Sequence, residues 1–97
     1  MKIRLTDSEI RLRLTPSEVD GLGNGQPVST NIIDGLSFTV QITEQEASTL
    51  EIDAGSIVIS VPRSEVSSPE PDTPLIHAFQ LTNTAVVIEL DLGRRPR

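Results

Sequence analysis

The stretch IRLRLTPSEVDGLGNG, residues 10–25, decides how this chain begins to fold. Its first five residues alternate apolar and basic side chains, and this period of two indicates a strand with one buried face. A helix start follows, because Thr15 suits the N-cap, Pro16 suits the first helical position and Glu18 completes a capping box. The Gly-Asn-Gly run at the end of the stretch stops the helix after two turns. We therefore expect a strand followed by one short helix near the N-terminus.

The segment before this stretch predicts a partner for its strand. MKIRL, residues 1–5, alternates in the same way. A two-residue turn at Asp7-Ser8 pairs Ile3 with Leu12 and Arg4 with Arg11, so that apolar side chains share one face and cations share the other. The cations on this predicted face are Lys2, Arg4, Arg11 and Arg13.

Three more hairpins are predicted along the chain. Asp34-Gly35 is a strong turn signal, and the strand before it needs a bulge to keep its register. Gly55-Ser56 predicts a type II′ turn with Ile52 opposite Ile59, because glycine occupies the first turn position. Asn83-Thr84 predicts a two-residue turn in the last hairpin, with Phe79 opposite Ile88 and Ile76 on the other face. The Pro- and Ser-rich segment 64–74 predicts a long loop with a helical turn near its start.

These signals predict a mainly β chain: an antiparallel meander of about eight short strands in four sequential hairpins, with one short helix. One two-turn helix is too small to cover eight strands, so we expect the meander to curl into a small barrel or a two-layer sheet. The length of 97 residues predicts a single domain, which we place at residues 1–93, with a basic tail at 94–97.

The composition excludes several kinds of site. The chain has no Cys, Tyr or Trp and only two Phe, so its core must be aliphatic and thiolate chemistry is excluded. The lack of Tyr and Trp also argues against a large protein interface with aromatic anchors. Lys2 and Arg4 interrupt the first apolar run and no run is long enough to span a membrane, which predicts a cytoplasmic protein without a signal peptide.

Charge is unevenly distributed along the sequence. Residues 1–13 carry a net charge of +2, residues 14–93 carry −11, and the tail at 94–97 carries +3. An acidic body repels nucleic acid and anionic membranes, so we expect neither as a partner. A site for an anion would have to be local, at the N-terminal hairpin or the tail.

Three segments resemble a family of small uncharacterised bacterial proteins: MKIR (1–4), IRLRLTPSEV (10–19) and LEIDAGSIVISVPR (50–63). Members of that family open with an MKIR strand and a strand close to IR-(L/F)-R-L-T-x-(S/T)-E-V. They later carry a glycine-containing hairpin that ends in Val-Pro or Leu-Pro. This chain departs from them in having a Pro- and Ser-rich loop where they have a helix, and in lacking a C-terminal aromatic and Cys. The resemblance implies a shared fold and no catalytic residues to carry over.

The four cations of the predicted hairpin form the candidate site, with two interpretations. They could bind a phosphate, a carboxylate or an acidic partner. Alternatively they could form the solvated face of the sheet, balanced by acids that also point outward on later strands. Those acids are Glu51, Asp53, Glu89 and Asp91. Like charges directly opposed on paired strands repel by about 0.2–1 kcal/mol, so some counter-charge is expected.

Other candidate chemistry is sparse. His77 is the only histidine and alternates with apolar residues, so we expect a half-buried residue that could line a pocket. The acid pairs Glu51/Asp53 and Glu89/Asp91 match no calcium-binding pattern. We therefore predict no metal, no cofactor and no catalytic constellation.

The leading hypothesis is a non-enzymatic binding or accessory module that contacts a protein partner through the basic hairpin or the 64–74 loop. One alternative is a barrel that binds a small molecule or an anion at the basic hairpin face. Another is a small acidic inhibitor or immunity-like protein that captures a basic partner. The last hairpin could also expose an edge strand that pairs with a second copy to form a homodimer.

Overall fold

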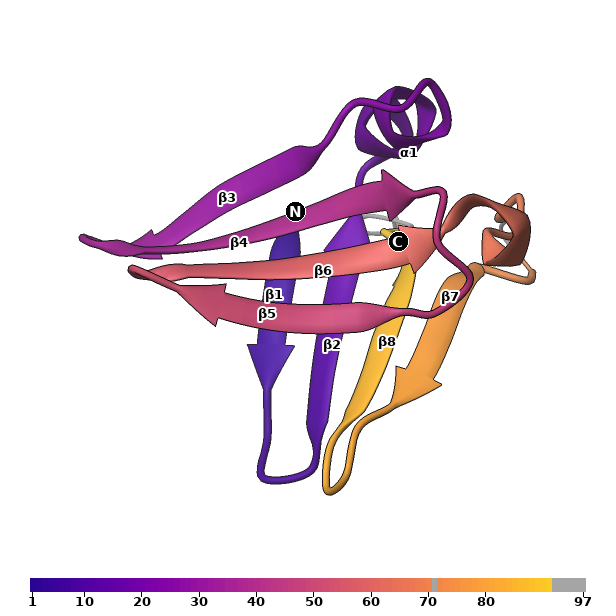
Figure 1. Cartoon of the computed structure of the whole chain (residues 1–97). Coiled ribbons are helices and arrows are strands. Elements are labelled where there is room, and N and C mark those ends of the chain that lie inside the picture. Colours follow the sequence, from indigo (N-terminus) through magenta and orange to yellow (C-terminus); the bar gives the residue numbers. More distant parts are fainter. Residues whose placement is uncertain (71, 92–97) are drawn as a thin grey trace, which may run out of the picture. The chain divides into compact units, whose positions relative to one another are not determined.

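Eight strands and one α-helix make up the described part of the chain, which is residues 1–70 and 72–91 of a computed structural model (Figure 1). They form two compact units. The first unit contains Met1–Val19 and the chain from Ser67 onward, and the second unit is Asp20–Val66. The predictions of a mainly β chain, of eight strands and of a short helix near the N-terminus are confirmed. The predicted tail at 94–97 lies outside the described residues, and the single domain over 1–93 stays a prediction.

The first unit holds a four-stranded sheet in the order β1-β2-β8-β7. Its strands are β1 (Lys2–Leu5), β2 (Glu9–Leu14), β7 (Leu75–Gln80) and β8 (Ala85–Leu90). The predicted register of the first hairpin is confirmed, since Ile3 lies opposite Leu12 and Arg4 opposite Arg11. The two inner strands, β2 and β8, are parallel. The buried apolar residues of this unit are Leu12, Leu14, Ile76, Val86 and Ile88.

The second unit holds a four-stranded sheet in the order β3-β4-β6-β5. Its strands are β3 (Val28–Ile33), β4 (Leu36–Thr43), β5 (Thr49–Asp53) and β6 (Ser56–Pro62). The inner strands β4 and β6 are parallel, and the register of β3 against β4 shifts between Asn31 and Ile33, which confirms the predicted bulge. The buried apolar residues of this unit are Leu22, Val28, Phe38, Val40, Ile59 and Val61.

The predicted antiparallel meander and barrel are therefore only partly right. All four hairpins form, but they assemble into two separate open sheets, and each sheet has a parallel pair at its centre. Burial gives a physical reason. The apolar strands β6 (SIVISVP) and β8 (AVVIEL) lie inside, whereas β1 and β5 carry charged side chains and lie at the edges, where charge discourages pairing with other chains.

The helix α1 (Pro16–Gly23) begins and ends as the sequence predicts. The Glu18 backbone N–H donates to Thr15 Oγ1 at 3.2 Å, and the Thr15 N–H donates to Glu18 Oε1 at 2.9 Å, which completes the capping box. At the other end Gly25 has a φ of 85°. The Gly25 N–H donates to the Leu22 carbonyl and the Gln26 N–H to the Gly21 carbonyl, the two bonds of a Schellman motif.

The turn between β5 and β6 differs from the prediction. Ala54 and Gly55 are its central residues, with φ of 49° and 82°, so the turn is of type I′ rather than type II′. The pairing moves by two residues and places Ile52 opposite Ile57. A shift of two keeps every side chain on its predicted face, because the strand period is two.

The last hairpin also differs. Its loop spans four residues, closed by the Leu81 N–H donating to the Thr84 carbonyl at 2.7 Å, and Phe79 lies opposite Val86 rather than Ile88. The register shifts again between Leu75 and His77. That irregularity turns Ile76 into the core, where it is 1% exposed, although its position in the sequence predicts the opposite face. The predicted helical turn after β6 is a 3₁₀ turn at Arg63–Glu65.

Candidate functional site

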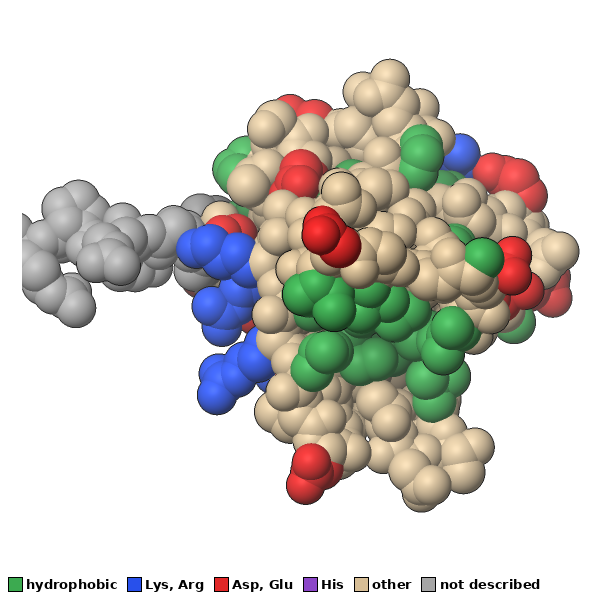
Figure 2. Space-filling view, turned by 90° about the vertical axis from the view of Figure 1, so that its left-hand side faces the viewer, with side chains coloured by type: hydrophobic (Ala, Val, Ile, Leu, Met, Phe, Trp, Pro, Cys, Tyr) green, Lys and Arg blue, Asp and Glu red, His purple; other side chains and the backbone are tan. Residues whose placement is uncertain are grey.

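The four predicted cations lie together on one face of the β1–β2 hairpin in the first unit. Lys2 is directly opposite Arg13, and Arg4 is directly opposite Arg11. Side chains on facing positions of an antiparallel pair lie close together, so these cations form a continuous basic surface. Figure 2 shows Lys and Arg side chains gathered along one border of the view. We call this surface, Lys2, Arg4, Arg11 and Arg13, the basic face.

Three acids of the same unit neutralise most of the basic face. Arg11 Nε lies 3.1 Å from Glu9 Oε1, and Arg11 Nη1 lies 3.1 Å from both carboxylate oxygens of Glu89. Arg13 Nε donates to Glu89 at 3.0 Å, so one carboxylate holds two guanidinium groups. The parallel pairing of β2 with β8 explains this contact, because it places Glu89 directly opposite Arg13.

Lys2 has a separate partner, since its Nζ lies 3.3 Å from Asp91 Oδ2. Glu89 and Asp91 were both expected as counter-charges. The other two expected acids, Glu51 and Asp53, lie on β5 in the second unit. Glu9 was missed, although its position two residues before Arg11 on one strand already places both side chains on one face.

The ion pairs alter the ionisation of the groups that form them. The hydrogen bond from Arg11 holds the pKa of Glu9 below its usual value, and the positive charge of Arg4 acts in the same direction. The hydrogen bonds to Glu9 and then to Glu89 raise the pKa of Arg11. Glu9 therefore stays charged to lower pH than an isolated glutamate, and Arg11 keeps this counter-charge.

Arg4 differs from the other three cations. Within residues 1–70 and 72–91 it forms no ion pair, although the charge of Glu9 is close enough to feel it. It lines a hollow of about 90 Å³ together with the other three cations and Ile3. The basic face has four cations against three acids, so Arg4 is the charge that its neighbours leave unbalanced.

His77, the other predicted site residue, lies on β7 opposite Ile88 and is half-buried. Its ring centroid lies 5.7 Å from that of Phe79. It does not line the hollow at the basic face, and no cluster of metal-ligating side chains occurs among the described residues. Its role in a pocket stays a prediction.

A second hollow, of about 280 Å³, lies in the second unit where two turns meet. Its lining comes from the β3–β4 turn and the β5–β6 turn. The residues are Asn31, Ile33, Asp34, Gly35, Leu36, Ser37, Ala54, Gly55 and Ser56. No local sequence signal predicts this hollow, because the parallel pairing that brings the two turns together joins strands that are not neighbours in the chain.

No helix in the described ranges is both long enough and apolar enough to cross a bilayer. Among known proteins, neither a curated protein nor a solved structure matches this chain. One family model does match it: that of the family of unknown function DUF7009, over residues 1–91. The match spans the helix and all eight strands of the described structure, and with them both hollows. The chain therefore belongs to DUF7009, a family of unknown function.

Proposed function

We propose that this protein is a non-catalytic binding module whose basic face accepts an acidic group of a partner protein. The observation that carries the proposal is Arg4, a cation without an ion pair in the described structure, which lines a hollow among three cations. A guanidinium presents a fixed fork of donors that matches a carboxylate, so it suits an acidic side chain or a chain terminus.

The paired cations support Arg4 rather than compete with it. Arg11 and Arg13 are each held by Glu89, which fixes their positions in the lining of the hollow. Binding costs less conformational entropy when the side chains that meet the ligand are already held in place. The basic face therefore offers one guanidinium without an ion pair in the described structure, beside cations that are held in place and whose charges are balanced.

A compact acidic group fits this surface better than nucleic acid does. The chain has a net charge of −6, and residues 14–93 carry −11, so an extended polyanion would be repelled beyond the hairpin. The hairpin residues 1–14 contain no aromatic side chain on which a base could stack. The alternative of a ligand-binding barrel is not favoured, because the strands form two open sheets and not a barrel.

Binding of an acidic peptide tests the proposal. We expect acetyl-Glu-Glu-Glu-amide to shift the backbone amide NMR signals of β1 and β2 in a saturable way. Arg4→Gln should weaken this binding about fivefold, the effect of losing one exposed ion pair, and should leave the melting temperature unchanged. Arg63→Gln is the matched control, because it removes a cation that pairs with Glu44 in the second unit.

The double variant Arg11→Gln/Arg13→Gln separates binding from folding. We expect it to lower the melting temperature, because it removes both partners of Glu89. Equal effects of Arg4→Gln and Arg63→Gln on peptide binding would show that only the overall charge matters. Loss of stability in Arg4→Gln without loss of binding would contradict the proposal as well.

Two other functions stay predictions. A homodimer through the last hairpin agrees with β7 being an edge strand, because its outer side has no pairing partner in the first sheet. An acidic inhibitor agrees with the charge of the second unit, where Asp20–Val66 contains seven acids and one cation.

A further inference from the structure

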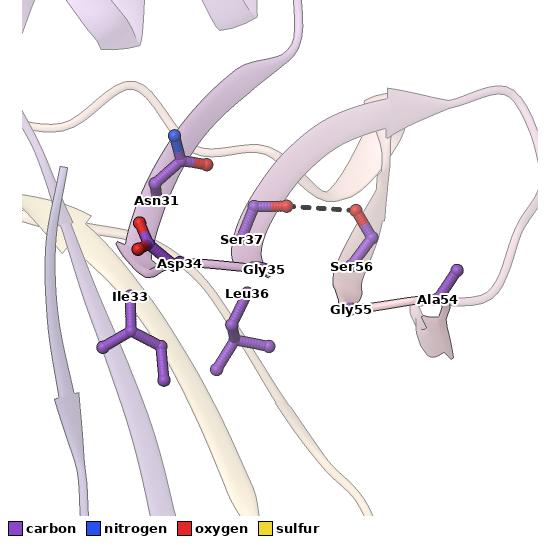
Figure 3. A pocket seen from close by; sticks show the side chains of 9 residues that line it. All are labelled: Asn31, Ile33, Asp34, Gly35, Leu36, Ser37, Ala54, Gly55 and Ser56. Carbon is purple, nitrogen blue, oxygen red and sulfur yellow. Dashed lines mark hydrogen bonds between the residues drawn. The ribbon is translucent and has the colours of Figure 1, made fainter.

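The hollow in the second unit follows from how its sheet is assembled. Because β4 and β6 are parallel, the turns that precede them lie at the same end of the sheet. The Ser37 N–H donates to the Gly55 carbonyl at 2.9 Å and joins the two turns. A hollow of about 280 Å³ lies at this junction, and we call it the turn hollow (Figure 3).

Oxygen acceptors from three strands and a turn line the turn hollow. Ser37 and Ser56, directly opposite each other on β4 and β6, share one hydrogen bond of 3.1 Å between their hydroxyls. In Figure 3 they lie on the same side of the sheet as Asn31, whereas Ile33 and Leu36 point the other way. The two hydroxyls and the Asn31 amide thus form a polar wall of the hollow.

Asn31 and Asp34 are two exposed residues of this lining whose polar side chains point to no protein partner. Neither side chain makes a hydrogen bond or an ion pair with another residue of the described structure. The serine pair uses one hydroxyl proton between its members and leaves acceptor lone pairs on both oxygens. A carboxylate, an amide oxygen and two hydroxyl oxygens are therefore available to a donor that enters the hollow.

We propose that the turn hollow binds a primary ammonium group. An ammonium carries three N–H donors and one positive charge, which match one carboxylate and two neutral oxygen acceptors. This inference concerns a different unit from the basic face and does not depend on the function proposed for that face.

The charge of the second unit favours a cation. Asp20–Val66 carries −6, the whole net charge of the chain, so anions are repelled and cations attracted. A divalent metal fits less well, because Asp34 is the only carboxylate in the lining and calcium sites usually combine several. A monovalent cation with donor hydrogens suits the single carboxylate.

Two sources could supply this ammonium: a lysine side chain of a partner protein or a free alkylamine. Both present the same group on the same kind of chain. The experiment therefore compares n-butylammonium with Nα-acetyl-lysine-N-methylamide. Tighter binding of the lysine derivative assigns a protein partner, and tighter binding of n-butylammonium assigns a small amine.

The test follows the backbone amide NMR signals of the full chain during titration with each probe. We expect saturable shifts at Gly35, Ser37, Gly55 and Ser56 with n-butylammonium. Tetramethylammonium is the matched probe, since it has the same charge but no N–H donor, and we expect no saturable shift with it. Asp34→Asn should weaken n-butylammonium binding about fivefold, as for an exposed ion pair, because Asn has nearly the shape of Asp without its charge.

Asp53→Asn is the matched control variant, because Asp53 carries the same charge just before the neighbouring turn and is not among the lining residues. We expect it to change the affinity less than twofold. Asn31→Ala is a second variant that removes an acceptor without changing charge, and it should also weaken binding. The proposal is overturned if no shift saturates, if tetramethylammonium binds equally well, or if Asp53→Asn weakens binding as much as Asp34→Asn.

Discussion

Gly55 occupies a position that no other residue can fill without moving the backbone. Its φ is 82°, in the left-handed region, and a Cβ built on it would overlap the carbonyl oxygen of Gly35. Gly35 has nearly the same φ, 84°, but its own Cβ would meet open space. Both positions therefore require a positive φ, but only the position of Gly55 also has no room for a side chain.

Alanine substitutions at these two positions should differ in cost. Gly35→Ala should lower the free energy of unfolding by about 1–2 kcal/mol, the price of placing a side chain in the left-handed region. Gly55→Ala adds overpacking against Gly35 and should cost about 3–4 kcal/mol in all. Urea unfolding followed by circular dichroism measures both values. Equal losses for the two variants would show that the turns can separate to admit a methyl group.

At Ala54 a substitution should stabilise the protein instead. It is the only non-glycine residue with a positive φ in the described structure, at 49°. Asn-Gly is the preferred pair for a type I′ turn, so Ala54→Asn should raise the free energy of unfolding by about 0.5–1 kcal/mol. Ala47→Asn, in the exposed connection after β4, is the control and should change stability by less than about 0.5 kcal/mol. A destabilised Ala54→Asn variant would refute this explanation of the turn.

At the scale of single elements, Glu18 in the first turn of α1 connects the helix to the N-terminus of the chain. The Met1 ammonium donates to Glu18 Oε2 at 2.9 Å, while Thr15 donates to the other carboxylate oxygen. Burial alone would raise the pKa of Glu18. The hydrogen bond from the Met1 ammonium and that from the Thr15 N–H outweigh burial, so the pKa lies below its usual value.

Stability should therefore depend on the ionisation of Glu18. A carboxylate whose pKa is lowered by folding stabilises the protein above its unfolded pKa of about 4.3, and this contribution is lost as the pH falls through the folded value. Glu18→Gln should lower the free energy of unfolding by about 0.5–1 kcal/mol at pH 7, and the difference from the parent should vanish in acid. Urea unfolding from pH 7 to pH 2 measures this.

Asp20→Asn is the control for that measurement. Asp20 is an exposed acid of the same helix and forms no ion pair within the described residues. We expect its variant to follow the stability of the parent protein across the whole pH range. If Glu18→Gln and the parent lose stability in parallel as the pH falls, another carboxylate is responsible.

Local sequence signals predicted the strands and the helix well, but they did not predict which strands lie side by side in a sheet. Thr15, Pro16 and Glu18 marked the helix start, and alternation fixed the pairing of Ile3 with Leu12, because capping and hairpin register depend on residues close in sequence. The parallel pairs could not be read this way. Leu12 pairs with Ile88 across most of the chain, and no local pattern states which strand lies beside which.

The candidate site shows the same division at the scale of the whole molecule. The basic face was predictable, because its four cations alternate along two strands joined by a short turn. Its counter-charge Glu89 was one of four equivalent acids in the sequence, and only the pairing of β2 with β8 selects it. The turn hollow requires β4 beside β6 and had no sequence signal at all.

Size indicates how the whole chain should unfold. The second unit contains 47 residues, and chains this short bury too little surface to be very stable alone. We therefore expect residues 1–93 to behave as one domain with a single unfolding transition. NMR signals of Leu12 and Ile88 in the first unit and of Val40 and Ile59 in the second should then disappear at the same temperature. Two separate midpoints would show that the units unfold independently.

The pairing of β2 with β8 also has a consequence for biosynthesis. The second unit is one continuous segment, and all four strands of its sheet are present as soon as β6 has been translated. The first hairpin must wait for β8 before its sheet can be completed, because β8 begins about 70 residues after β2 ends. The delay is roughly 4–14 s at ordinary elongation rates. During that interval β2 can pair only with β1, and its other side, along which Leu12 and Leu14 are fully buried in the finished protein, has no partner, so we expect the nascent chain to bind a holding chaperone.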